Sequence, residues 1–164
     1  IHSFLTHRGF SLARRYWEMR WQEEQAPETA IPHGFSLRGF APGDEELLTQ
    51  VQNDAFGGSW GFCSNTVEEV SYRTKLSCCS PEGILFLLKG GDAAAYCWTR
   101  MDGDGKEKVG TVWMAGVTPI YRGLGLGRAI LLAGMRYLLS QGVREVELTV
   151  DSENSPATRI YLPL

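Results

Sequence analysis

Residues 109–143 read VGTVWMAGV-TPIYRGLGLG-RAILLAGMRYLLSQGV, and this stretch decides the fold. Alternating and β-branched residues before Pro119 predict a strand over 109–117. Apolar residues then recur at helical spacing and predict a helix from Arg128. The glycine-rich turn between the two leaves backbone N–H groups uncovered at a helix N-terminus, and arginines flank it. The stretch therefore predicts a phosphate-binding site.

Two common phosphate-binding motifs do not match this turn. No glycine is followed by Lys and a hydroxyl residue, which excludes a Walker loop. The glycines also lack the third position of the Gly-x-Gly-x-x-Gly dinucleotide fingerprint. What remains is Arg-x-x-Gly-x-Gly, from Arg122 to Gly127, directly after a strand. This motif resembles the acyl-CoA pyrophosphate loop of the GNAT superfamily of N-acyltransferases; the alternative is a turn that only connects two elements.

Composition limits the possible partners. The chain has 164 residues, 43% hydrophobic and 21% charged, which suits one globular domain with a substantial core. Its net charge of −3 provides no basic field, so we expect no nucleic-acid partner. No apolar run approaches the roughly 20 residues of a membrane-spanning helix, so we expect no membrane partner.

The cysteines indicate neither a metal site nor a disulfide framework. Cys63, Cys78, Cys79 and Cys97 show no Cys-x-x-Cys spacing. We expect them to be reduced, which favours a cytoplasmic location, and we expect no metal cofactor.

The chain divides into three segments. Residues 1–24 contain a possible strand and are predicted to be either the tail of a preceding GNAT-like repeat or an N-terminal segment that completes the sheet. Residues 25–34 are polar and proline-bearing, as in a linker. Residues 35–164 form the GNAT acyltransferase domain. Because an open sheet edge promotes aggregation, we expect residues 1–24, from this chain or a neighbour, to cover it.

The pattern within 35–164 predicts the order β-α-α-β-β-β-α-β-α. Asp44 is the expected N-cap of the first helix, and Thr66-x-x-Glu69 is a capping box for the second. This order resembles the GNAT fold, an α/β (α+β) architecture. The resemblance implies a central mixed, mostly antiparallel sheet that is splayed between strands 4 and 5 and flanked by helices. The family carries a β-bulge before the splay, and Gly116 is its predicted position.

The resemblance implies that acetyl-CoA is the co-substrate. Its arm would lie in the splay, with the Val117 amide facing the thioester carbonyl, and its pyrophosphate would contact the loop amides. Asn154 and Ala157 match the family's Asn-x-x-Ala-x-x-x-Tyr pattern beside the arm. The predicted contacts are Ala115, Gly116, Val117, Arg122, Gly123, Leu124, Gly125, Leu126, Gly127, Arg128, Ala129, Asn154 and Ala157.

The same pattern places Tyr161 as the general acid that protonates the leaving thiolate; the alternative is a buried aromatic. The general base is left open. Some relatives carry a Glu after a glycine on the central strand, where this chain has Thr111. Water, or an acid from the acceptor side, could act instead. The candidate acids are Asp54, Glu68 and Glu69.

These features predict an N-acetyltransferase that acts on a primary amine of a small molecule or peptide by direct attack. The acceptor site is expected at the loop 58–62 and the second helix, with Trp60, Tyr72, Trp98 and Trp113 as candidate contacts. The chain looks most like the mycothiol-synthase branch, in which two such domains occur in tandem, so a homodimer or pairing with a second GNAT-like domain is expected. The alternatives are a catalytically silent module that binds acyl-CoA or a protein, and a nucleotide-phosphate binder.

Overall fold

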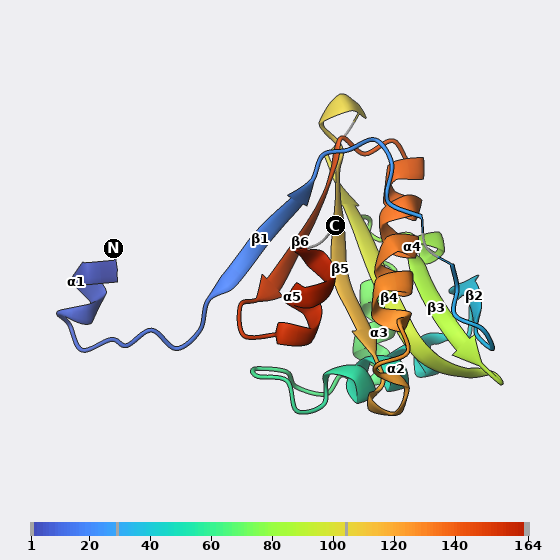
Figure 1. Ribbon diagram of the computed structural model, residues 1–164, viewed down its shortest axis with the longest axis horizontal. Helices are drawn as coiled ribbons and strands as arrows, with labels where there is room; N and C mark the ends of the chain where they lie inside the picture. Colours follow the sequence, from blue (N-terminus) through green and yellow to red (C-terminus); the bar gives the residue numbers. More distant parts are fainter. Residues whose placement is uncertain (1, 29, 104, 163–164) are drawn as a thin grey trace.

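A single six-stranded sheet forms the centre of the molecule (Figure 1). The structure, a computed structural model, describes residues 2–28, 30–103 and 105–162. The strands lie in the order β1-β6-β5-β4-β3-β2, where only β5 and β6 are parallel among these pairs. The prediction of a mixed, mostly antiparallel sheet is therefore confirmed. The strands are β1 (Tyr16–Trp21), β2 (Ser36–Gly39), β3 (Ile84–Lys89), β4 (Asp92–Asp102), β5 (Val109–Val117) and β6 (Glu145–Asp151).

Helices cover both faces of the sheet. The long helix α4 packs on one face, while α2 and α3 pack on the other, and α5 lies near β6 on the α4 side (Figure 1). The order of elements after residue 35 matches the predicted order. Among the described residues, no helix is long and apolar enough to cross a bilayer. The helices are α1 (His2–Thr6), α2 (Glu45–Phe56), α3 (Val67–Thr74), α4 (Leu126–Ser140) and α5 (Ser155–Tyr161), with 3-10 turns at Pro81–Gly83, Gly105–Glu107 and Pro119–Tyr121.

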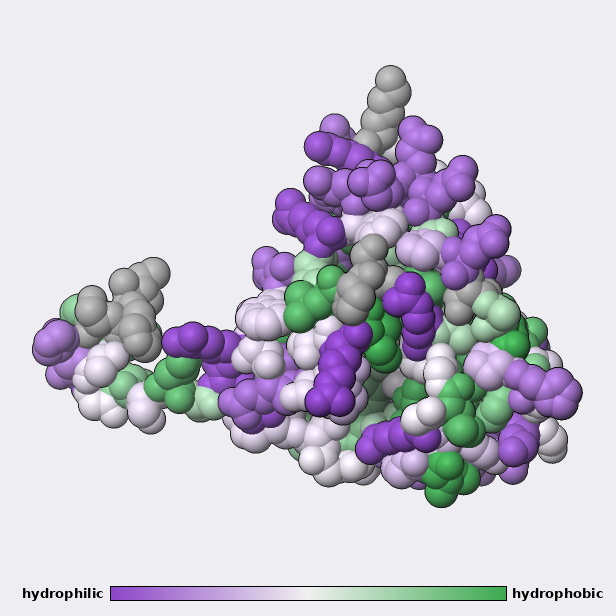
Figure 2. All heavy atoms as spheres, in the orientation of Figure 1, coloured by the Kyte–Doolittle hydropathy of each residue, from purple (hydrophilic) through white to green (hydrophobic). Residues whose placement is uncertain are grey.

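The N-terminal segment supplies one outer strand of the sheet. β1 pairs antiparallel with β6 from Tyr16 opposite Asp151 to Trp21 opposite Val146. α1 stands away from the sheet, and apolar side chains lie exposed between it and the body (Figures 1 and 2). That residues 1–24 belong to another repeat stays a prediction.

Two local predictions require correction. The helix expected from Arg128 begins at Leu126. Asp44 stands at the N-cap of α2, but its side chain does not cap the helix. Its carboxylate accepts hydrogen bonds from the Arg38 guanidinium (2.9 Å) and the Ala41 amide (2.7 Å) instead. Arg38 lies on β2, six residues before Asp44, and capping preferences do not predict such a contact.

The capping box of α3 is confirmed. The Thr66 hydroxyl accepts from the Glu69 amide at 3.2 Å, and the Glu69 carboxylate accepts from the Thr66 amide at 2.9 Å. These two bonds satisfy donors that the first turn of a helix otherwise leaves unpaired.

A glycine allows α4 to approach the sheet closely. A Cβ atom on Gly134 would lie 2.3 Å from the Cys97 sulfur and 3.4 Å from the Thr99 methyl group. Cys97 is fully buried in the core between α4 and the sheet. Since a packed core yields little to added volume, this position requires glycine.

We therefore expect Gly134→Ala to destabilise the domain. The clash should exceed the helix-propensity gain of about 1 kcal/mol and leave a net loss of about 1–3 kcal/mol. Thermal unfolding would measure this as a lower Tm. Adding Cys97→Ala removes the clashing sulfur, so the double variant should recover part of the loss; a double variant with strictly additive effects would contradict this packing argument.

Candidate active site

The candidate site begins where β5 and β6 part. Their parallel ladder runs from Val109 opposite Glu145 to Val112 opposite Leu148. β5 continues to Val117 and β6 to Asp151, and the described chain shows no further rung between them. The predicted splay between these strands is present, and we call the unpaired stretch of backbone between the ends of β5 and β6 the opening.

The bulge that redirects β5 lies at Trp113. The β4–β5 register pairs Trp98 with Met114 and Thr99 with Val112, which leaves Trp113 without a partner. Such an extra residue bends a strand and increases its twist. It therefore turns β5 at the point where its ladder with β6 ends.

The prediction of a bulge at Gly116 is wrong. Gly116 pairs regularly with Tyr96 on β4. It is glycine for a packing reason, because a Cβ atom there would lie 2.8 Å from the Ala55 Cβ and 3.0 Å from a ring carbon of Phe56. The absence of a side chain lets α2 sit directly on β5.

Two backbone amides of β5 face the opening. The Thr118 amide donates to the Ala94 carbonyl on β4 at 3.0 Å. In an antiparallel ladder the hydrogen-bonded positions alternate, so Gly116 also bonds toward β4. Ala115 and Val117 then direct their N–H and C=O groups away from β4 and into the opening.

The glycine-rich loop presents a run of unpaired donors. Within the described part of the chain, the amides of residues 123–128 have no protein acceptor. The run is bounded at both ends, since the Arg122 amide donates to Pro119 (3.3 Å) and the Ala129 amide to Gly125 (3.2 Å). The predicted contact through the Ala129 amide is therefore not supported, because that donor is already used inside the helix.

The three loop glycines are required for different reasons. Gly123 and Gly125 have φ angles of 81° and 79°, a left-handed conformation that L side chains rarely adopt. Gly127 is helical, but its Cβ would lie 2.9 Å from the Ile160 Cδ1. The first two glycines shape the loop, and the third lets α5 pack beside the first turn of α4.

The two arginines of the motif differ in their surroundings. The Arg122 side chain donates to the carbonyls of Val117 (3.2 Å) and Ala55 (2.9 Å). It thus braces the end of β5 against the end of α2. Arg128 is half-buried on the first turn of α4, beside the unpaired amides.

Tyr161 lies at the end of α5 and packs against the core cluster that Ala115 and Val117 also contact. Burial, with a smaller effect from the nearby Cys97 thiol, raises the pKa of Tyr161 to about 12. The phenol therefore carries its proton at neutral pH, as a general acid must. Burial likewise raises the pKa of the Cys97 thiol to about 12, which disfavours a thiolate nucleophile there.

Comparison with known proteins identifies the family. The family model described as "Acetyltransferase (GNAT) family" matches residues 46–162. The chain belongs to this family. The predicted resemblance to the GNAT superfamily is therefore confirmed.

Several curated relatives are mycothiol acetyltransferases. Those of Pseudarthrobacter chlorophenolicus and Actinosynnema mirum are each 35% identical over 159 residues, which are 93% and 95% of this chain but 49% and 52% of the relatives. A GCN5-related N-acetyltransferase structure from Sphaerobacter thermophilus has a TM-score of 0.84 at 28% identity, covering 99% of this chain and 50% of that one. The chain thus spans about half the length of these proteins.

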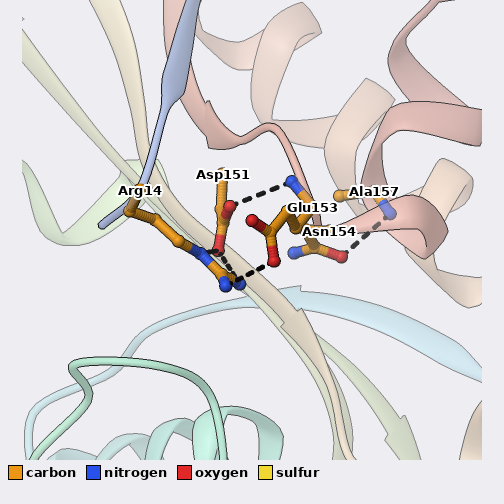
Figure 3. A network of polar contacts seen from close by, with 5 residues as sticks. All are labelled: Arg14, Asp151, Glu153, Asn154 and Ala157. Atoms are coloured by element: carbon orange, nitrogen blue, oxygen red, sulfur yellow. Dashed lines mark hydrogen bonds and ion pairs between the residues drawn. The ribbon is translucent and has the colours of Figure 1, made fainter. Parts of the chain in front are cut away.

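An arginine before β1 adds to the contacts between the N-terminal segment and the GNAT domain (Figure 3). Arg14 precedes β1, and its guanidinium contacts the Asp151 carboxylate at 2.6 Å and the Glu153 carboxylate at 2.6 Å. Its centre also lies 5.5 Å from the ring of Trp60 in the α2–α3 loop. Arg14 was not predicted as a site residue, because 137 positions separate it from Asp151 and no local pattern marks such a pair.

Asn154 follows this network and begins α5. Its side-chain oxygen accepts a hydrogen bond from the Ala157 amide at 3.2 Å (Figure 3). Asn154 is therefore a helix N-cap, and a contact with the acyl-CoA arm through its amide NH₂ group remains a prediction. Ala157 is half-buried on the same helix.

The predicted acceptor aromatics occupy different environments. Trp98 is fully buried and stacks edge-to-face on the half-buried Trp113, with ring centroids 5.1 Å apart. Trp98 is thus a core residue, and Trp113 forms the surface at the bulge. Trp60 and Tyr72 are 58% and 70% exposed. No group of three or more potential metal ligands occurs among the residues that the structure describes.

The Arg14 contact makes the edge of the GNAT domain sensitive to acid. The Arg14 hydrogen bond, aided by the Glu153 amide, lowers the pKa of Asp151 below its ordinary value of 3.8. A lowered pKa stabilises the fold above the ordinary value, and this stabilisation is lost as the pH falls through the lowered pKa. NMR titration should show Asp151 returning toward 3.8 in Arg14→Leu but not in the neighbouring Arg15→Leu; an unchanged titration in Arg14→Leu would refute the pairing.

Proposed function

We propose that this domain transfers an acetyl group from acetyl-CoA to a primary amine. The observation that carries the proposal is the run of unpaired amides at 123–128, placed at the end of an opening between two sheet strands. Helix N-terminal amides and the helix dipole favour a phosphate there. A related GNAT structure, from Brucella melitensis, was solved in complex with acetyl-CoA; it has a TM-score of 0.60 at 20% identity and covers 71% of this chain and 75% of that one.

The opening suits the acyl-CoA arm. An extended amide-bearing chain can pair with the outward-facing groups of Ala115 and Val117 as an added strand does. The predicted donor to the thioester carbonyl is the Val117 amide, and Ala115 offers a second donor nearer the closed end. Fixed amides directed at the carbonyl oxygen would stabilise the oxyanion that forms when the amine attacks.

Tyr161 supplies the proton for the leaving sulfur. It contacts the same core cluster as the residues that line the opening, and its pKa of about 12 keeps it protonated. We assign it the role of general acid. The cysteines take no part as nucleophiles in this proposal, because direct attack needs no covalent enzyme intermediate.

The acceptor is proposed at the level of its chemistry, as a primary amine of a small molecule or peptide. The relatives are named mycothiol acetyltransferases, so the amine precursor of mycothiol is one acceptor to test. We further propose a cytoplasmic location, and a partner that is a second copy or a second GNAT-like domain.

A calorimetric titration with acetyl-CoA, followed by an assay of CoA release with a panel of amines, tests the function. Binding followed by release supports acetyl transfer. Binding without release across the panel would instead favour a catalytically silent module, and equal competition by ATP would favour a general nucleotide-phosphate site.

Charge reversal on α4 tests the phosphate site. A glutamate in the first turn of a helix is favoured by the dipole, so Arg128→Glu should keep or raise the Tm. The same glutamate repels a pyrophosphate, so the Kd for acetyl-CoA should rise about 10- to 100-fold, and less at high salt. Arg144→Glu, beyond the other end of α4, makes the same change in net charge and should leave the Kd unchanged. Equal affinities in all three proteins would refute the loop assignment.

Removal of one oxygen tests the acid. Tyr161→Phe keeps the buried ring and removes the proton donor, so kcat should fall about 100-fold while the Kd for acetyl-CoA stays the same. Steady-state kinetics and calorimetry measure the two quantities. An unaltered kcat would exclude Tyr161 as the acid.

A further inference from the structure

A polar row crosses the sheet on its α2 side, where the opening begins. The registers place Arg100 on β4 opposite Thr111 on β5, Thr111 beside Glu147 on β6, and Glu147 opposite Arg20 on β1. Residues directly opposite each other on paired strands share a face, so all four side chains lie on one face of the sheet. That face is the α2 side, because Gly110, the residue before Thr111, contacts α4 on the other side. Glu147 is the one carboxylate in this row.

Glu147 lies at the closed end of the opening. The β5–β6 ladder has one more rung after it, Val112 opposite Leu148, before the strands part. The carboxylate is held by the Arg20 Nε at 2.8 Å, and its side chain is 33% exposed. It is thus fixed in direction and still reached by water.

Strand alternation places Trp113 on the same face as Thr111. Trp113 packs with the α2-side core cluster and lies two residues after Thr111 along β5. The Arg100 guanidinium lies 5.7 Å from its ring. The surface around Glu147 therefore contains the aromatic ring of Trp113 and the positive charges of Arg20 and Arg100.

The acid and this carboxylate lie on opposite faces of the sheet. Tyr161 packs with the α4-side cluster, whereas Glu147 belongs to the α2 side. A thioester held in the plane of the sheet, between β5 and β6, is open to both faces. α5 occupies the α4 side, and α2 packs on β4 and β5 on the other side. The proposed route of the amine runs along β6, on the face that carries Glu147.

We propose that Glu147 is the general base of the reaction. This inference rests on the proposed acetyl transfer. Glu147 lies level with Thr111, so this role requires the thioester carbonyl at the Ala115 amide, the donor nearer the closed end, and not at Val117. The Glu147 carboxylate takes one proton from the acceptor ammonium through bridging water and releases it to solvent. The free amine forms the C–N bond to the thioester carbon, the C–S bond then breaks, and the nitrogen gives up a second proton. The departing sulfur takes its proton from Tyr161, and the second proton from the nitrogen passes through solvent to the Tyr161 phenolate. The products are then the amide and CoA with one net proton released.

The acids expected from the acceptor side lie in other surroundings. The Glu69 carboxylate is used in the capping box of α3. Asp54 lines a cavity of about 430 Å³ between α2, Asp92 and the turn at Pro119–Tyr121. Glu68 lies exposed on α3. Glu147, by contrast, stands beside Thr111 at the closed end of the opening.

The charged groups around Glu147 enter any pH profile. Arg20 faces it from β1, Arg100 lies two strands away on β4, and Glu145 precedes it by two residues on β6. Glu18 lies on the same face of β1, opposite Thr149. Glu145 is buried and accepts from Gln22 at 3.1 Å, so it provides a charge-matched control on the same strand.

The experiment compares Glu147→Gln with Glu145→Gln on two acceptors. With an alkylamine, which is protonated at neutral pH, Glu147→Gln should lower kcat/KM about 100-fold, and its rate should follow the free-amine fraction as pH rises. With an alkoxyamine, which is already a free base at neutral pH, Glu147→Gln should approach the wild-type rate. The Kd for acetyl-CoA and the Tm should not change, and Glu145→Gln should show no such dependence on the amine.

The outcomes separate this inference from the proposed function. A wild-type rate for Glu147→Gln with the alkylamine would overturn the assignment of the base alone. An equal loss with both amines, or a weaker Kd for acetyl-CoA, would show a structural role and also overturn it. Wild-type protein that binds acetyl-CoA yet releases no CoA with either amine would overturn the acetyl transfer and, with it, the base.

Discussion

The structure depends on the parting of β5 and β6 in the middle of its sheet. Backbone groups inside a sheet are normally paired, and leaving a stretch unpaired is costly unless another partner is available. Here the fold maintains the opening from both sides. β5 stays bonded to β4 past the bulge at Trp113, and β6 is paired along its length with β1. An extended ligand can then take the place of the absent ladder.

The N-terminal segment is therefore part of the site's support. Without β1, the last residues of β6 would lack a ladder on either edge, since β5 has already diverged. Arg14 adds a second tie, because it joins the segment to Asp151 and Glu153 at the turn that leads into α5. The helix that carries Tyr161 is thus anchored to a strand from the other end of the chain. Arg14 also contacts the ring of Trp60, which connects the segment to the α2–α3 loop.

Local sequence predicted what local geometry determines. Gly123 and Gly125 mark a loop because their backbone is left-handed, and Thr66 with Glu69 marks a helix start because both bonds lie within four residues. The bulge could not be placed in this way. Gly116 suggested one, but its small size serves contact with Ala55, and the residue that loses its partner is a tryptophan. Strand register depends on partners distant in sequence, and a pattern of alternation does not contain it.

The same limit explains why Glu147 escaped notice in the sequence. Its strand shows a regular alternation of apolar and charged residues, in which every glutamate looks like a solvent-facing position. Only the parallel register sets it beside Thr111, and therefore on the face that Trp113, two residues further along β5, also occupies. An opening in the plane of a sheet has two faces, so it separates the group that receives a proton from the group that donates one. In the proposed reaction, Glu147 acts on the amine from one face and Tyr161 acts on the leaving sulfur from the other.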